Sequence, residues 1–498
     1  MRTSFILTLI ILVVASCSSP ESNEETINFP EASIAPDWTR NASIYEVNIR
    51  QHTPEGTINA FSSHLPEIKA LGTDILWLMP IFPVGEKFRK ATQNTLIEEI
   101  EDPEERKKYL GSPYAIKDYK AVNPDFGTDH DFRAFVQKAH DLGMKVILDI
   151  AANHSAWDHE WITSHPEYYS KIAPGTTPWN PDWMSQHPEF YAELTERGLT
   201  YPIDEGETDW WDTAELNYDN AELRTEMIDI LKYWVEEFNV DGYRCDVAMQ
   251  VPTDFWEEAR KELDKQKLLF MLAEAEQIDH LNYAFDMNYG WELHHIMNNI
   301  AKGEMNVNNL TEYLAKYKTQ YGPDAYRMNF ITNHDENSWN GTLNERMGDA
   351  QLAMAGLMAT LPGMPLIYSG QEAGLDKRLR FFEKDTIEWQ ESELRSFYTT
   401  LLQQKKINKA LWNGEAGGEM IALTTNSPEK ILAYVREKDG DKIIAVLNLS
   451  GEAAEFEFSQ PVVIDGLHDL FYNGSEEKLS TKSVSMGPWE YIILTSKR

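Results

Sequence analysis

Residues 241–246 read DGYRCD, and this short stretch decides how the chain around it folds. An apolar helical run, Met227 to Phe238, precedes it, and Asn239 to Gly242 follow as a turn. The stretch predicts a strand on which Arg244 and Asp246 share one face, because they are two residues apart. A guanidinium favours an ionised carboxylate, which could act as a nucleophile at the open end of a strand. A buried structural ion pair is the commoner arrangement, and this stretch alone slightly favours it.

The length and charge of the chain exclude several classes of function. Its 498 residues exceed one ordinary core, so we expect two or three domains. The net charge of −36 disfavours a nucleic-acid partner and docking on an anionic membrane surface, since both need a basic face. A neutral sugar is compatible with this charge. The 15 Trp and 22 Tyr offer flat faces for sugar rings, although most are expected to fill the core.

The first residues have the pattern of a secretory signal, with a positive start and an apolar run from Phe5 to Val14. Val14 to Cys17 resembles the lipobox of bacterial lipoproteins. That resemblance implies removal of residues 1–16 and lipidation of Cys17. It also implies export to a bacterial membrane, on the periplasmic or surface face of the outer membrane; an ordinary signal peptide is the alternative. Residues 17–40 then form an acidic tether. Cys245 is the one other cysteine, so no disulfide framework is expected, and we interpret its side chain as packing.

Short strands alternate with helical patterns along the body of the chain. Such alternation indicates a parallel sheet, and eight units over roughly 350 residues fit a closed (β/α)₈ barrel with insertions. An open doubly wound sheet is the alternative, although no Gly-rich phosphate turn follows the first strand. The expected strands are Ile44–Ile49, Ile75–Pro80, Lys145–Ile150, Gly242–Val247, Leu268–Ala273, Tyr283–Met287, Met328–Thr332 and Pro365–Tyr368.

Four of these strands end on polar side chains. In a barrel of this kind the chemistry lies at the carboxyl ends of the strands. Any one polar end could be a solvated turn, but four at one rim favour an active site. The four ends are Asp149–His154, Arg244–Asp246, Ala273–Glu276 and Thr332–Asp335.

Two insertions and a change of pattern complete the expected domains. We expect the barrel over residues 41–154 and 219–406, with an inserted domain at 155–218 and a small antiparallel β domain at 407–498. A charged insertion, Val84–Ser112, predicts a solvated helix at the rim. Exposed Trp in the inserted domain would stack on sugars, and buried Trp would form a subdomain core; we expect some of each. These residues are Trp157, Trp161, Trp179, Trp183, Trp210 and Trp211.

The ordered motifs of the chain resemble the α-amylase family of glycoside hydrolases. DIAANH, DGYRCD, LAEAE and TNHDE are similar to its four signatures, and GMPLIYSGQE is similar to its eighth-strand segment. The resemblance covers the body from about Ile44 to the end. It implies an α/β fold: a (β/α)₈ TIM barrel with a domain inserted after the third strand and a C-terminal antiparallel β-sandwich.

The resemblance also implies roles for individual residues. Asp246 would be the nucleophile, Glu274 the general acid/base, and Asp335 the carboxylate that stabilises the transition state. Cleavage with retention needs one ionised and one protonated carboxyl, roughly 5 Å apart. Glu276, two residues beyond Glu274, is the competing acid. The groups implied to hold the nucleophile and the reacting sugar are Arg244, His154, His334 and Tyr114.

Some positions depart from the family pattern. Met249 and Gln250 stand where amylases proper have a Lys-His pair, and Val247 resembles members that act on α-1,6 links or on both link types. The linkage is therefore open. Asn153 and Asn217 match calcium-ligand positions of many members, which would make calcium structural. Asn153 could instead only hydrogen-bond its loop.

These observations predict a retaining hydrolase of α-glucosidic, mainly α-1,4, bonds in starch-type glucans and maltooligosaccharides. No organic cofactor and no nucleic-acid partner are expected, membrane attachment would be by the lipid alone, and the oligomeric state is open. A transglycosylase or glucosyl isomerase would use the same residues. A non-catalytic glycan-binding protein is the third hypothesis, which the presence of all three carboxylates disfavours.

Overall fold

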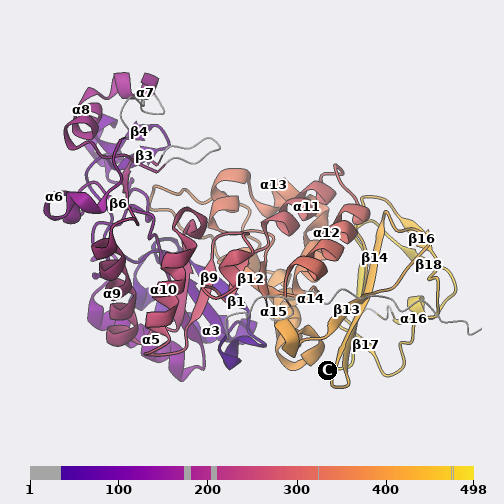
Figure 1. Cartoon of the computed structure of the whole chain (residues 1–498). Coiled ribbons are helices and arrows are strands. Elements are labelled where there is room, and N and C mark those ends of the chain that lie inside the picture. Colours follow the sequence, from indigo (N-terminus) through magenta and orange to yellow (C-terminus); the bar gives the residue numbers. More distant parts are fainter. Residues whose placement is uncertain (1–34, 173–180, 203–209, 323–324, 473, 475) are drawn as a thin grey trace, which may run out of the picture.

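Eight parallel strands close into a barrel in the computed structural model of this chain (Figure 1). This confirms the expected (β/α)₈ fold, and the side chains of alternate strand residues fill the barrel interior. In order around the barrel the strands are β1 (Ile44–Val47), β12 (Met364–Tyr368), β11 (Tyr326–Asn329), β10 (Met287–Tyr289), β9 (Phe270–Ala273), β8 (Gly242–Cys245), β5 (Lys145–Ile150) and β2 (Ile75–Leu78).

The structure describes residues 35–172, 181–202, 210–322, 325–472, 474 and 476–498. Cys17, the expected signal and most of the expected tether lie outside these residues, as does Trp179. Within the ranges given, no helix is both long and apolar enough to span a membrane.

Helices cover the outside of the barrel, and several of them have capped ends. The Thr128 hydroxyl accepts the N–H of Asp131 at 3.3 Å to start α5, and Asn239 ends α9 in the left-handed conformation. These helices are α1 (Ile49–His52), α2 (Ile58–Ser62), α3 (Leu65–Leu71), α5 (Asp129–Asp141), α9 (Ala221–Phe238), α10 (Thr253–Leu263), α11 (Trp291–Ala301), α12 (Val307–Gln320), α13 (Leu343–Met347), α14 (Gln351–Thr360) and α15 (Glu393–Ile407).

Two expected strands are shifted in the structure. The strand expected at Tyr283–Met287 begins only at Met287, because the N–H of Phe285 closes a turn onto the His280 carbonyl at 3.0 Å. The strand expected at Met328–Thr332 is instead Tyr326–Asn329. Its expected end, Phe330 and Ile331, is fully buried in a loop, and burial alone does not distinguish a loop from a strand.

The inserted domain packs its own core. Its hairpin of β6 (His154–Ala156) and β7 (Thr213–Glu215) carries short helices that lie at one side of the barrel in Figure 1. Those helices are α6 (Trp161–Ser164), α7 (Pro181–Gln186) and α8 (Pro188–Arg197). Four of the Trp are buried: Trp157, Trp183 and Trp211 pack around Phe190 within the inserted domain, whereas Trp161 stacks on Tyr119 of the barrel.

The charged insertion at Val84–Ser112 is helical only in part, so the expectation of a solvated helix holds only for a short segment of it. Its first half forms a hairpin of β3 (Lys90–Thr92) and β4 (Thr95–Leu96), because Gln93 and Asn94 make a turn between them. Its charged second half contains a 3-10 helix at Ile97–Glu99 and the short α-helix α4 (Pro103–Arg106), which the Asp102 side chain caps. Lys90 pairs with Asp212 at 3.1 Å, which ties the hairpin to the inserted domain.

The C-terminal domain is antiparallel, as predicted, and lies at the other side of the barrel in Figure 1. Arg436 joins it to the barrel by donating from Nη1 to the carbonyl oxygens of Thr360 and Leu361, each at 3.0 Å. Its larger sheet contains β13 (Glu419–Ala422), β14 (Ile431–Lys438), β15 (Asp441–Asn448), β19 (Tyr491–Thr495) and β17 (His468–Asp469). A second sheet pairs β16 (Ala454–Phe456) with β18 (Val484–Met486), and α16 (Glu476–Leu479) precedes β18.

A close approach of two strands sets the start of β8. A Cβ on Gly242 would lie 1.9 Å from the carbonyl oxygen of Phe270, so only glycine lets β8 lie this near β9. Two residues later, Arg244 faces into the barrel. Cys245 is a fully buried free thiol, which agrees with its interpretation as packing.

Candidate active site

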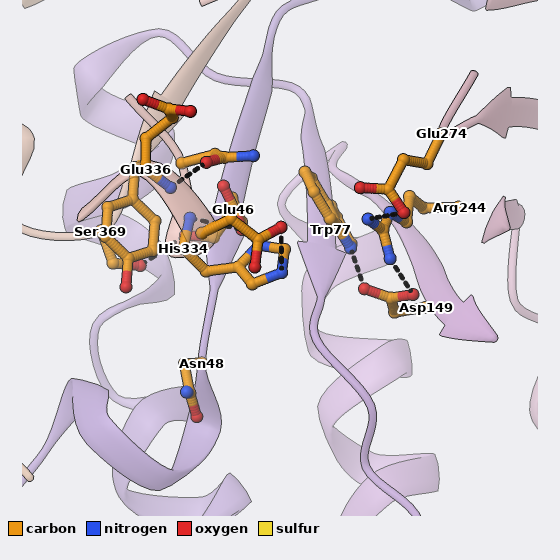
Figure 2. A network of polar contacts seen from close by, with 12 residues as sticks. Glu46, Asn48, Trp77, Asp149, Arg244, Glu274, His334, Glu336 and Ser369 are labelled. Atoms are coloured by element: carbon orange, nitrogen blue, oxygen red, sulfur yellow. Dashed lines mark hydrogen bonds and ion pairs between the residues drawn. The ribbon is translucent and has the colours of Figure 1, made fainter. Parts of the chain in front are cut away.

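Arg244 joins three carboxylates at one rim of the barrel, and Figure 2 shows it beside two of them, Asp149 and Glu274. Its Nη1 lies 2.8 Å from Asp149 Oδ1 and 2.6 Å from Asp246 Oδ1, and its Nη2 lies 2.8 Å from Glu274 Oε2. Asp149 is in β5, and the other two carboxylates directly follow β8 and β9. Since the carboxyl ends of parallel strands meet at one rim, groups distant in sequence converge here.

Asp246 is the carboxylate implied to be the nucleophile. Burial raises the pKa of Asp246 to about 6, while the ion pair with Arg244 opposes that rise. A carboxyl with this pKa is still mostly ionised at pH 7. Arg244 therefore lowers the pKa of Asp246, as expected, although burial raises this pKa by more.

Glu274 has the higher pKa of the two carboxyls. Burial raises the pKa of Glu274 to about 7; Arg244 opposes the rise, and the charges of Asp246 and Asp335 add to it. The N–H of Val247 donates to Glu274 Oε2 at 2.8 Å. Val247 holds a φ of 37°, in the left-handed region that β-branched residues rarely adopt. A strained turn after β8 thus directs a peptide N–H at this carboxyl.

His334 lies between two carboxylates. Its Nδ1 is 2.5 Å from Glu46 Oε1, and its Nε2 is 3.2 Å from Asp335 Oδ2. Burial alone would lower the pKa of His334, but Asp335 and Glu46 raise it to about 9. The imidazole is therefore protonated at neutral pH. Figure 2 shows it facing Glu46 across the barrel mouth.

Tyr114 bridges the two halves of this network. Its hydroxyl lies 3.0 Å from Asp149 Oδ2 and 2.9 Å from His334 Nε2. Because Nε2 of a protonated His334 is a donor, the Tyr114 hydroxyl accepts from it and donates to Asp149. The Tyr114 ring contacts the rings of His334 and Phe381 in near-parallel orientation, with centroids 5.7 Å and 6.1 Å away. Stacking of Tyr114 on a sugar stays a prediction.

His154 lies beside this network on β6. Its side chain is buried, and its Nδ1 has no hydrogen-bond partner among the residues that the structure describes. Burial lowers the pKa of His154 to about 4, so the ring is neutral and can both donate and accept. These properties suit its expected contact with a hydroxyl.

Glu276, the competing acid, belongs to a different network. Its Oε1 lies 2.5 Å from Nη2 of Arg327 and accepts the N–H of Glu292 at 3.1 Å. Arg327 neighbours two residues of β11, Tyr326 and Met328, that line the barrel interior. Strand alternation therefore points Arg327 outward, away from the rim network around Arg244.

The two expected calcium ligands fit the ion poorly. The Asn153 side chain donates to Gln250 Oε1 at 2.9 Å, and Asn217 Oδ1 accepts the N–H of Asp219 at 3.1 Å. Both side chains are neutral amides, whereas calcium sites normally include carboxylates. Among the described residues, no three His, Cys, Asp or Glu side chains gather as metal ligands. Calcium binding stays a prediction here.

Sequence reasoning assigned no role to several members of the network. Asp149 accepts from Trp77 Nε1 at 3.1 Å, and Tyr289 accepts from Arg244 Nε at 3.1 Å. Glu46 and Asp149 had a detectable signal, since each is a lone acid within an otherwise apolar strand. An acid there must be paired, because an isolated buried charge is costly.

A groove of about 460 Å³ lies beside the network. One wall is the segment from Ala91 to Asn94 in the β3–β4 hairpin. The other wall includes Trp339, which is 40% exposed, and Phe381, whose far side stacks on Tyr114. The groove thus carries aromatic faces up to the rim network, as a path for a chain of sugar rings would require.

Comparison with known proteins identifies two matching family models. Residues 21–418 match the model described as alpha amylase, catalytic domain, and residues 421–493 match that of maltogenic amylase, C-terminal domain.

Individual relatives are more distant. Alpha-amylase MalA of Haloarcula japonica is 26% identical over 430 residues, which are 84% of this chain but only 57% of that protein. A 4-alpha-glucanotransferase of Thermotoga neapolitana is 26% identical over 64% of this chain and 68% of that protein. The crystal structure of a noncanonic maltogenic alpha-amylase, AmyB, from Thermotoga neapolitana superposes with a TM-score of 0.73. Its identity is 27%, and the match covers 91% of this chain and 98% of that one.

Proposed function

Because the chain belongs to the alpha-amylase family, we propose that it is a retaining glycoside hydrolase of starch-type glucans and maltooligosaccharides. It cleaves α-glucosidic, mainly α-1,4, bonds through a glycosyl-enzyme on Asp246, with Glu274 as acid/base. The observation that carries the proposal is the position of Arg244, within 2.8 Å of both carboxylates.

The two pKa values support the division of roles. Asp246, with a pKa raised to about 6, is the more ionised group and suits attack on the anomeric carbon. Glu274, with a pKa raised to about 7, keeps its proton more readily and suits donation to the leaving oxygen. After the first step, the ionised Glu274 would take a proton from water, which then attacks the glycosyl-enzyme.

The remaining groups suit the sugar and its developing charge. Asp335 is 34% exposed at the rim, so its carboxylate is accessible to substrate hydroxyls. Protonated His334 lies 3.2 Å from Asp335 and orients that carboxylate, and neutral His154 remains the candidate for a contact with a sugar hydroxyl. The groove beside Trp339 would hold further glucose units.

A direct test is to trap the intermediate. Incubation with an activated fluoro-sugar of the maltosyl type should add one glycosyl group to the peptide that contains Asp246, as read by mass spectrometry. Asp246→Asn should abolish both the labelling and the hydrolysis of maltoheptaose. Labelling elsewhere, or unchanged hydrolysis by Asp246→Asn, would refute the assignment.

Glucan transfer is the alternative reaction, and the similarity of this chain to a 4-alpha-glucanotransferase supports it as a second candidate function. Water and a sugar hydroxyl compete for the same glycosyl-enzyme, so the same carboxylates serve both outcomes. Incubation with maltoheptaose and added glucose separates them: hydrolysis yields short maltooligosaccharides, whereas transfer yields products longer than the substrate. Pullulan and panose as substrates define the linkage.

Export and lipid anchoring at Cys17 form a separate proposal, supported only by the similarity of Val14 to Cys17 to a lipobox. Metabolic labelling with a palmitate analogue tests it. The wild type should be labelled and Cys17→Ser should not; label that persists in Cys17→Ser would refute lipidation at this position.

A further inference from the structure

A second cavity shares no lining residue with the network around Arg244. Its volume is about 360 Å³, within the roughly 300–1,000 Å³ typical of small-molecule sites. α3, α15 and the loop before α15 supply most of its wall. Tyr45 of β1 and Glu372, just after β12, form its floor, because both are almost fully buried.

His52 forms part of the wall of this cavity. The side chain is 1% exposed, and its Nδ1 has no hydrogen-bond partner among the described residues. Burial lowers the pKa of His52 to about 3, so the ring is neutral. Because this nitrogen is itself buried, His52 shapes the wall of the cavity and does not offer a hydrogen bond to a ligand.

Trp389 gives the cavity a flat aromatic face. Its Nε1 donates to the His52 carbonyl at 2.7 Å, and its ring lies 4.7 Å from the His52 ring. These contacts fix the indole, yet its side chain stays 37% exposed. A fixed and partly exposed indole can pack against the C–H face of a pyranose at little entropic cost.

The polar groups around this face suit a neutral ligand. Glu372 Oε1 accepts the Tyr45 hydroxyl at 2.6 Å, and the Arg395 Nη2 lies 3.8 Å from it. Arg395 is 39% exposed and can donate to a ligand as well. Glu67 and Glu391 add acceptors at the mouth, so carboxylates outnumber the single guanidinium. An anion is therefore disfavoured, whereas sugar hydroxyls, which both donate and accept, match this mixture.

We propose that this cavity binds one hexose unit of an α-glucan chain at a non-catalytic site. The neutral sugar follows from the lining groups, whereas the choice of an α-glucan rests on the proposed function. A glucan held here as well as at the rim would be retained by two contacts on one molecule.

Titration calorimetry with maltotriose tests the site directly. The full chain carrying Glu274→Gln, in which turnover is slowed strongly, should show two binding sites. Adding Trp389→Ala should remove one of them, while Tyr472→Ala, at a 78% exposed aromatic of the C-terminal domain, should leave both. A single site, or two sites unaffected by Trp389→Ala, overturns the proposal. If Trp389→Ala lowers the melting temperature, Arg395→Ala gives the same test by weakening the second site alone.

Kinetics separate this inference from the proposed function. Trp389→Ala in the otherwise wild-type chain should lower kcat/KM on soluble starch about threefold or more, because one of two linked contacts is lost. It should leave kcat/KM on a p-nitrophenyl maltoside unchanged. If the protein hydrolyses glucans but Trp389→Ala changes neither maltotriose binding nor kcat/KM on starch, only the second site is refuted. Trp389-dependent binding without any hydrolysis refutes the proposed function only.

Discussion

Oε1 of Glu46 lies 2.5 Å from Nδ1 of His334, and both side chains are buried at the mouth of the barrel. Asp335 faces the other ring nitrogen of His334 at 3.2 Å. The imidazole is therefore held in one orientation by a carboxylate on each side. Glu46 thus acts as a positioning residue, because its contact to the sugar would run through His334.

Glu46→Gln should lower the pKa of His334 from its value of about 9. The change removes one of two negative charges that favour the imidazolium, so we expect a fall of about one unit or more. Titration of the labelled histidine by NMR measures it. Glu336→Gln is the matched control, because Glu336 pairs with His294 at 3.1 Å instead. An unchanged His334 titration in Glu46→Gln would show that the short contact has no electrostatic role.

The pH dependence of kcat/KM should be bell-shaped. Activity should rise with pH through about 6, as Asp246 becomes ionised. Activity should fall again as the pH increases through about 7, because Glu274 loses its proton. The two groups interact, so the measured values belong to the pair. A chromogenic maltoside assayed from pH 4 to 9 gives the profile, and a constant rate over that range would contradict these roles.

Glu274→Gln and Glu276→Gln should differ strongly. Loss of the general acid/base should lower kcat/KM on maltoheptaose by about 10²–10⁴-fold. Glu276→Gln should change it only a few-fold, because the Glu276 carboxylate is paired with Arg327 at 2.5 Å in another network. Assays of both variants with matched melting curves make the comparison. The opposite order would transfer the acid role to Glu276.

Sequence alone predicted the barrel because its strands are compact apolar runs that end on polar motifs. It located Arg244, Asp246 and Glu274 together, since the ends of parallel strands meet at one rim. It did not predict the pairing of Glu46 with His334, because these residues are 288 positions apart and only barrel closure brings them together. The left-handed backbone conformation of Val247 was not predictable either, because β-branched residues rarely adopt it.

The insertions show a second limit. The charged run within Val84–Ser112 predicted a helix, but the α-helix there extends only from Pro103 to Arg106, and the turn at Gln93 and Asn94 forms a hairpin before it. The Trp-rich insertion was ambiguous for a related reason: composition does not reveal whether an indole faces solvent or its own subdomain.

Arg244→Met should destabilise the protein, and by an amount that depends on pH. Its guanidinium is fully buried among three carboxylates, so its removal leaves buried charges uncompensated, at a cost of about 3–5 kcal/mol. Without Arg244 the carboxyl pKa values rise further, so the unfolded state releases protons that the folded state keeps. The loss should therefore be larger at pH 8 than at pH 4.5, where the carboxyls are already protonated.

Urea unfolding at these two pH values measures the difference. Arg224→Met is the matched control, because Arg224 pairs with Asp254 and Glu258, which are 70% and 52% exposed. Removal of such surface pairs should change the free energy of unfolding by less than about 1 kcal/mol at either pH. An equal loss for Arg244→Met at both pH values would mean that packing, not charge, accounts for the contribution of Arg244. The three carboxylates would then already be neutral in the folded protein, which would also remove the ionised nucleophile from the mechanism.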